Sequence, residues 1–251
     1  MASSKSKLYS SDQNPIRSNQ LPVRAVIVDL DGTMVDTLGD FQVALNGMLS
    51  DLNLPAVERL AVELAVGKGS EHLVRTVLKR QQALSNGALA TEVEPRGKSE
   101  ACFEKALARY QHHYQLVNGQ HSQVYPGVVE GLAALKVRGL SLACLTNKPL
   151  VFARALLEMK GLSGYFSQVF GGDSFERKKP DPLPLRRTCE ALLSRPEQTL
   201  MVGDSRNDAQ AARGAGCPVV LVSYGYNHGE PIRGVDADGY VASLAEIPAL
   251  L

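Results

Sequence analysis

Residues able to do chemistry follow apolar runs at four places along this chain. They are Asp29 and Asp31 after VIV, Thr146 and Asn147 after ACL, Lys179 after QVFGG and a loop, and Asp204 with Asp208 after LMV. Three carboxylates (Asp29, Asp31, Asp204) in one small volume would repel each other, so they need a cation, and ligation by carboxylates and water suits Mg²⁺. With a lysine and two neutral donors nearby, such a site could handle a phosphoryl group.

The aspartates offer a covalent route for this chemistry. A carboxylate can attack phosphorus to give an aspartyl-phosphate, which water then hydrolyses. Lys179 can balance charge on the carboxylate and on the phosphate, while the Thr146 hydroxyl and the Asn147 amide can donate to phosphate oxygens. The residue types therefore favour hydrolysis of a phosphate ester.

The elements that must position these residues are read from periodicity. RAVIVDL, residues 24–30, is short and β-branched, which predicts a central parallel strand. After YPG, strands alternate with helices over the rest of the chain. The predicted strands are LSLACLT, QVFGG, TLMVGD and VVLV, and the predicted helices are Val128–Val137, Leu150–Met159, one after Pro184, and Asn207–Ala215. This order predicts an α/β fold with a parallel sheet, whose carboxyl edge would gather the four sets of residues.

A second block, residues 36–122, has apolar residues at helical spacing and is predicted to be all-helical. It interrupts the α/β pattern after the first strand. We therefore predict a core formed by residues 23–35 and 123–251, an inserted helical domain at 36–122, and a polar, disordered leader at 1–22. Asp36 is expected to lie at the hinge between core and insert.

Composition limits the classes of function. The chain has 251 residues, 44% of them apolar, and 27 basic against 26 acidic residues, so its charge gives no case for binding nucleic acid or an anionic membrane. The four cysteines are far apart in sequence and suggest neither a disulfide framework nor a zinc site. Without an apolar signal sequence or a long apolar run, a cytoplasmic location is predicted.

Four segments together resemble the motifs of the haloacid dehalogenase superfamily, in the same order and at strand ends. They are DLDGT, LTNKP, KKPDP and GDSRND. The resemblance implies a Rossmann-like core with a small helical cap. It also implies that Asp29 is nucleophile and Mg²⁺ ligand, that Asp31 is the acid/base and binds metal through its carbonyl, and that Asp204 completes the metal site. Thr146, Asn147 and Lys179 would hold the phosphoryl group, and Asp208 would orient Lys179 or a metal-bound water.

More narrowly, YPGV, KKPDPLPL, VGDSRNDAQAARGAGCP and YGYNHGE resemble bacterial phosphoglycolate phosphatases. The resemblance implies phosphoglycolate as substrate and glycolate as product. An acid at position 31 places the chain with the phosphatases, since the dehalogenases of the superfamily lack it. Val28 departs from the phenylalanine usual before the nucleophile. Alternatives are a phosphatase for another small phosphate, such as a sugar phosphate or pyrophosphate, a phosphomutase, or a catalytically idle phosphate-binding or protein-interaction member.

Within the helical insert, GKGSEH at residues 67–72 is the loop expected to face the substrate. Gly67 and Gly69 permit close backbone approach, and Lys68 offers a cation to a carboxylate. The alternative is an ordinary glycine-rich connection between helices. The expected partner is a small phosphomonoester, without nucleic acid or membrane, and the protein is expected to be a monomer or homodimer.

Overall fold

A six-stranded parallel sheet forms one half of the molecule in this computed structural model, which describes residues 22–85 and 96–251. The strands lie in the order β5-β4-β1-β6-β7-β8, with β1 near the middle. Their bounds are β1 Ala25–Val28, β4 Ser141–Leu145, β5 Gln168–Phe170, β6 Thr199–Gly203, β7 Val219–Val222 and β8 Gly239–Val241. The predicted parallel α/β sheet is confirmed, and its first strand occupies the central position that its apolar sequence requires.

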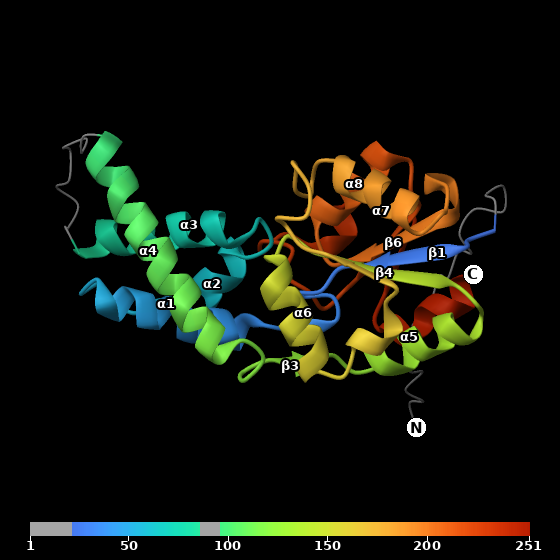
Figure 1. The fold of residues 1–251 in the computed structure, drawn as a ribbon, viewed down its shortest axis with the longest axis horizontal. Coiled ribbons are helices and arrows are strands. Elements are labelled where there is room, and N and C mark those ends of the chain that lie inside the picture. The colour runs from blue at the N-terminus through green and yellow to red at the C-terminus, as the bar shows by residue number, and fades with distance from the viewer. Residues whose placement is uncertain (1–21, 86–95) are drawn as a thin grey trace, which may run out of the picture.

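Helices cover both faces of this sheet (Figure 1). On one face lie α5 (Val128–Val137), α6 (Leu150–Met159) and the 3₁₀ helix Leu244–Leu250, and on the other α7 (Leu183–Ala191) and α8 (Arg206–Ala215). The strand β1 serves both layers, because Val26 and Val28 pack with the first set and Ala25 and Ile27 with the second. Alternating side chains of one strand thus join two hydrophobic layers.

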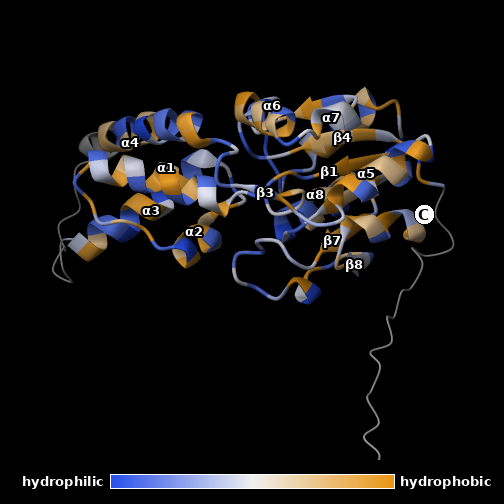
Figure 2. Cartoon of the chain, turned by 90° about the horizontal axis from the view of Figure 1, so that it is seen from below, coloured by the Kyte–Doolittle hydropathy of each residue, from blue (hydrophilic) through white to orange (hydrophobic). Residues whose placement is uncertain are grey.

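The other half of the molecule is a group of four helices, α1 (Leu38–Asp51), α2 (Arg59–Ala65), α3 (Ser70–Ser85) and α4 (Arg96–Val117). They have a hydrophobic cluster of their own, built mainly from α1, α3 and α4. Figure 2 shows the apolar faces of these helices turned toward one another. A short antiparallel pair, β2 (Val35–Asp36) with β3 (Gln123–Val124), carries both connections to the sheet.

The predicted helices Val128–Val137 and Leu150–Met159 coincide with α5 and α6, and α8 begins one residue earlier than predicted. The predicted strand QVFGG is shorter in the structure, since β5 ends at Phe170 and two buried glycines follow. A Cβ on Gly171 would lie 2.3 Å from Leu150 N, and one on Gly172 would lie 2.3 Å from Asn147 O, so this turn packs directly against the segment that follows β4. The predicted leader 1–22 lies almost wholly outside the described residues, and the domain boundaries stay a prediction.

Two further observations concern the helices and the cysteines. In the described residues, no helix is long and apolar enough to cross a membrane. The four cysteines are free thiols in the structure, and Cys189 and Cys217, distant in sequence, place their sulfurs 3.8 Å apart in the core.

Candidate active site

Asp29 ends the central strand and points into the middle of the site. Its backbone N–H donates to Val202 O on β6, and its own Oδ1 accepts from Leu30 N at 2.7 Å. Lys179 Nζ lies 3.0 Å from the same carboxylate oxygen. The pKa of Asp29 is raised to about 7, chiefly by burial and in part by the nearby carboxylates of Asp208 and Asp31, while Lys179 lowers it. The strand therefore presents a nearly buried carboxylate in a fixed orientation.

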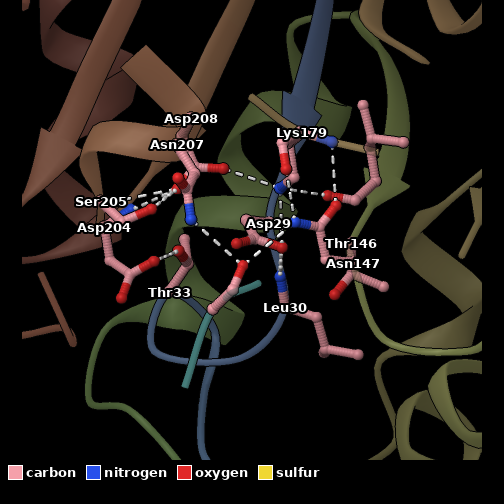
Figure 3. Close-up of polar contacts among 12 residues, drawn as sticks. Asp29, Leu30, Thr33, Thr146, Asn147, Lys179, Asp204, Ser205, Asn207 and Asp208 are labelled. Carbon is pink, nitrogen blue, oxygen red and sulfur yellow. Dashed lines mark hydrogen bonds and ion pairs between the residues drawn. The ribbon is translucent and has the colours of Figure 1, made fainter. Parts of the chain in front are cut away.

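Lys179 is enclosed by acceptors. Its ammonium donates to Asp208 Oδ1 at 2.7 Å and to Leu145 O at 2.8 Å, besides contacting Asp29. Burial lowers the pKa of Lys179, but the carboxylates of Asp208 and Asp29 outweigh burial and raise the pKa overall. The ammonium thus stays charged and joins two carboxylates (Figure 3).

Asp208 is fixed by the start of α8. Ser205 and Asp208 form a capping box, in which Asp208 Oδ2 accepts from the Ser205 hydroxyl at 2.7 Å and from Ser205 N at 3.2 Å. The other oxygen of Asp208 binds Lys179. Asp208 was predicted to orient Lys179 or a metal-bound water; its side chain contacts Lys179, and the role stays a prediction.

Asp204 follows β6 and is held by two loops. Its Oδ1 accepts from the Thr33 hydroxyl at 3.2 Å, and its Oδ2 accepts from Tyr226 N at 2.6 Å. Burial raises the pKa of Asp204, and the carboxylates of Asp208 and Asp29 raise it further. A carboxylate that is costly to ionise in this way is a candidate cation ligand.

Three carboxylates at this edge could share one metal ion. One oxygen each from Asp29, Asp204 and Asp208 lies within 4.8 Å of the others, and all three residues are buried. Oxygen donors of this kind fit a hard divalent cation such as Mg²⁺. Asp208 binds Lys179 and caps α8, whereas the motif resemblance assigns the ligand roles to Asp29 and Asp204.

A small cavity lies between the sheet edge and the four-helix group. Its lining comprises Asp29, Asp31, Phe41, Val66, Gly67, Gly69, Ser70, Leu73, Thr146, Asn147 and Lys148. The predicted substrate loop therefore reaches the cavity through Gly67 and Gly69. Lys68 is exposed and does not line it, so the cation expected there points elsewhere.

The predicted phosphate ligands Thr146 and Asn147 both line this cavity. The Asn147 amide also ties the site together, because it donates to Lys179 O at 2.8 Å and Gly67 O at 3.0 Å while its oxygen accepts from Lys179 N. Thr146 Oγ1 accepts from Lys148 N at 3.2 Å. Asn147 therefore links the sheet edge to the loop between α2 and α3.

Three residues at the site were not identified from the sequence. Lys148 is buried and donates to Asp31 Oδ1 at 2.6 Å, Asn207 donates to Gly67 O at 3.2 Å, and Tyr226 binds Asp204. Lys148 and Asn207 stand inside the motifs LTNKP and GDSRND, which was an available signal. Tyr226 lies in YGYNHGE, which was noted for its resemblance to phosphoglycolate phosphatases but without a role for the tyrosine.

Comparison with known proteins agrees with this arrangement. The model of the haloacid dehalogenase-like hydrolases matches residues 26–222. The phosphoglycolate phosphatase of Thiobacillus denitrificans is 42% identical over 92% of this chain and 96% of its own length. The plasmid-encoded phosphoglycolate phosphatase of Cupriavidus necator is 44% identical over 92% and 94%.

A similar fold is seen in the crystal structure of a predicted phosphoglycolate phosphatase from Haemophilus somnus, with a TM-score of 0.83, 32% identity, and coverage of 91% of this chain and 97% of that one. The resemblance stated from the motifs is thereby confirmed, as is the prediction of a phosphoric monoester hydrolase. The chain belongs to the haloacid dehalogenase-like hydrolases.

Proposed function

We propose that this protein hydrolyses 2-phosphoglycolate to glycolate and phosphate through an aspartyl-phosphate on Asp29. The observation that carries the proposal is the pair Asp29 and Asp31 lining one cavity, with Lys179 bound to the first and Lys148 to the second. Two carboxylates in different charge surroundings can take the separate roles of nucleophile and acid/base. The names of the Thiobacillus and Cupriavidus relatives support the substrate.

The first step would form the covalent intermediate. The Asp29 carboxylate attacks phosphorus, the bond to the glycolate oxygen breaks, and Asp31 gives its proton to that oxygen. In the second step Asp31 takes a proton from water, which attacks phosphorus and releases phosphate and free Asp29. Leu30 N and Lys179 hold the Asp29 carboxylate in place throughout.

A divalent cation fits the donor set described above. Asp29, Asp204 and the backbone carbonyl of Asp31 would hold Mg²⁺, which when bound would screen the carboxylate nucleophile from the phosphate charge. Thr146 and Asn147 would lie beside the phosphoryl group, and Lys179, kept in place by Asp208, would balance the charge of Asp29 and of the phosphate. Gly67 and Gly69 would let the loop before α3 close near the leaving group.

The small cavity supports a small leaving group. Closure of the helices α1–α4 over the sheet edge would exclude bulk water from the reaction. These helices would then act as the cap, with boundaries at residues 36–122, and the remaining described chain as the core. A cytoplasmic location and the choice between monomer and homodimer stay predictions.

The test compares wild type and Asp29→Asn in Mg²⁺ and in EDTA. We expect phosphate release from phosphoglycolate by wild type with Mg²⁺, loss in EDTA, and a decrease of about 10³-fold or more in Asp29→Asn, since an amide is a poor nucleophile. Full activity of Asp29→Asn would exclude the mechanism. A wild-type preference for glucose phosphate or pyrophosphate over phosphoglycolate would instead exclude the substrate.

A further inference from the structure

We propose that Lys148 binds the carboxylate of the leaving group and thereby selects phosphate esters of small hydroxy acids. The inference rests on the proposed function and identifies the residue that recognises its substrate. Lys148 lies three residues after the end of β4, in the sheet half of the molecule, whereas the sequence pointed to Lys68 in the helical half.

Lys148 lies in an unusual place for a lysine. Its side chain is 2% exposed, yet the residue lines the cavity beside Asp29 and Asp31. The ammonium lies 4.5 Å from the ring centroid of Phe41 on α1 and 4.9 Å from that of Tyr114 on α4. Aromatic rings and burial lower the local dielectric constant, which strengthens the attraction of this cation for an anion in the cavity.

The ammonium of Lys148 keeps hydrogen-bonding capacity. Within residues 22–85 and 96–251, its one hydrogen-bonded acceptor is Asp31 Oδ1, at 2.6 Å, and an ammonium has three protons to donate. Lys179 differs, because Asp29, Asp208 and Leu145 O already surround it. Lys148 is also the sole cationic residue lining the cavity in the described part of the chain.

A second feature of the cavity favours an anion. Gly69 and Ser70, at the N-terminus of α3, line it together with Leu73 from the next turn. The first N–H groups of a helix have no partners within the helix and carry partial positive charge. The acidic residue of this turn, Glu71, is exposed and outside the lining. A carboxylate in the cavity would therefore meet Lys148 and this helix terminus together.

The position of Lys148 also suits the reaction. Asp31 has to reach the ester oxygen of the leaving group, and in a 2-phospho acid the carboxylate is attached to the carbon that bears that oxygen. A lysine bound to Asp31 can therefore contact this carboxylate while Asp31 contacts the ester oxygen. A phosphate ester without the carboxylate would leave the Lys148 ammonium bound to Asp31 alone. Such an ester would therefore bind with a less favourable free energy.

The experiment compares two substrates in matched variants. Values of kcat/KM are measured for phosphoglycolate and for ethyl phosphate, which lacks the carboxylate, with p-nitrophenyl phosphate as a second carboxylate-free reference. We expect Lys148→Met to lower the ratio of phosphoglycolate to either reference by about 10- to 150-fold, the range of a lost charge-assisted hydrogen bond. Lys148→Arg should keep most of the ratio, and Lys68→Met should keep the wild-type ratio.

Lys148→Gln is the control for a folding defect, because glutamine can still donate a hydrogen bond to Asp31 but carries no charge. The fold of each variant is checked by circular dichroism. The same ratio decrease in Lys148→Gln supports the proposal. An equal decrease of kcat/KM for all substrates in Lys148→Met and Lys148→Gln would show that Lys148 serves only Asp31, and would overturn the proposal. A decrease in the ratio of phosphoglycolate to the references in Lys68→Met, with none in Lys148→Met, would overturn it as well. If wild type itself prefers the carboxylate-free esters, the proposed substrate fails first.

Discussion

Single side chains in the site depend on partners supplied by other elements. Lys179 comes from the loop before α7, but its ammonium is held by Asp29 from the end of β1 and by Asp208 from α8. Asp208 in turn accepts from Ser205, so one carboxylate orients a lysine and caps a helix at once. Removing such a residue should affect stability and catalysis together.

Replacing Asp208 with asparagine tests this double role. The change removes the charge facing Lys179 and weakens the capping box, so we expect kcat/KM to fall by about 10- to 100-fold and the free energy of unfolding by about 1–3 kcal/mol. Enzyme assays and urea unfolding measure the two effects. Asp238→Asn is the matched control, because Asp238 also accepts from a backbone amide, Val219 N, and from a cation, Arg213, far from the cavity.

The control variant should lose some stability and keep its activity. Asp208→Asn with unchanged kcat/KM would show that Lys179 needs no help from α8. A loss of activity in both variants to the same degree would point to a general folding defect.

Gly32 is a second residue whose role is set by close contact. It has φ +81°, and a Cβ there would lie 2.2 Å from Asp204 Oδ2 and 2.8 Å from the Tyr226 ring. Gly32→Ala should therefore displace Asp204, reducing activity by about 100-fold or more by loss of the carboxylate geometry. Gly139→Ala is the matched control, with φ +75° and nothing within 4 Å of the added Cβ.

Both alanine variants share the cost of a left-handed conformation, about 1–2 kcal/mol. Only Gly32→Ala adds the collision with the site. Equal kcat/KM in the two variants, measured alongside their thermal unfolding, would contradict the assignment of Asp204 to the reaction.

Among the single residues, the sequence predicted part of the site. Residues that directly follow strands, such as Asp29 and Asp204, could be placed because the carboxyl ends of parallel strands share an edge. The same rule does not show which of Lys68 and Lys148 lines the cavity. Which of two loop lysines turns into a cavity depends on side-chain packing against Phe41 and Tyr114, which no sequence period encodes.

Among the elements, the connection between the two halves of the molecule is tied to the loop that holds Asp204. Tyr226 is buried, and its phenol donates to Asp36 Oδ1 at 2.5 Å and accepts from Thr37 N at 2.9 Å, at the junction of β2 and α1. Its backbone N–H binds Asp204. Burial raises the pKa of Tyr226, so the phenol stays protonated and can donate. Tyr226 therefore joins Asp204 to the segment expected to act as a hinge.

Tyr226→Phe should loosen this segment while leaving the amide contact to Asp204 in place. Thr37 N would lose its acceptor, so we expect faster hydrogen exchange over residues 35–40 and a KM increase of about 3- to 10-fold, from the loss of about 1 kcal/mol. Tyr240→Phe is the control, since Tyr240 donates to Val235 O at the far edge of the sheet.

The control should show wild-type KM and wild-type exchange over residues 35–40. If Tyr226→Phe matches it in both measurements, the phenol does not fix the junction. An effect confined to kcat would indicate that Tyr226 acts on Asp204 instead.

Elements were predicted to different degrees. The helices α5 and α6 show a clear helical period and were predicted with the correct bounds. The strands β2, β3 and β8 were missed, and β2 and β3 have only two residues each, which cannot show an alternating pattern. The pair β2 and β3 forms between residues nearly 90 positions apart, and pairing at that separation is set by tertiary packing.

In the whole molecule, buried carboxylates that are unfavourable to ionise lie between two hydrophobic units. The sheet layers and the four-helix group each have a separate apolar cluster, and the cavity with its carboxylates lies where they meet. The fold could be anticipated from the alternation of strands and helices, and the chemistry from the types of residue that follow the strands. How the helical group closes over the sheet depends on contacts such as Asn147 with Gly67, which the sequence did not indicate.

The buried carboxylates should lower the stability of the metal-free protein. Burial and the neighbouring Asp208 and Asp29 raise the pKa of Asp204, so its ionised form is unfavourable in the folded state at neutral pH. Asp204→Asn removes that charge. We therefore expect it to raise the Tm in EDTA, by about 2–4 °C for each kcal/mol relieved, while abolishing phosphatase activity.

Added Mg²⁺ should reverse the order of the two Tm values, so that wild type becomes more stable than Asp204→Asn. At 100 times its Kd, a ligand adds about 2.7 kcal/mol to the stability of wild type, and Asp204→Asn should gain far less because a ligand is missing. Asp51→Asn is the control of opposite sign, since Arg109 and His113 lower the pKa of Asp51 and favour its charge on the outer surface. That variant should lose slight stability in EDTA and keep the full Mg²⁺ response. A lower Tm for Asp204→Asn in EDTA, or an Mg²⁺ response equal to that of wild type, would remove Asp204 from the metal site.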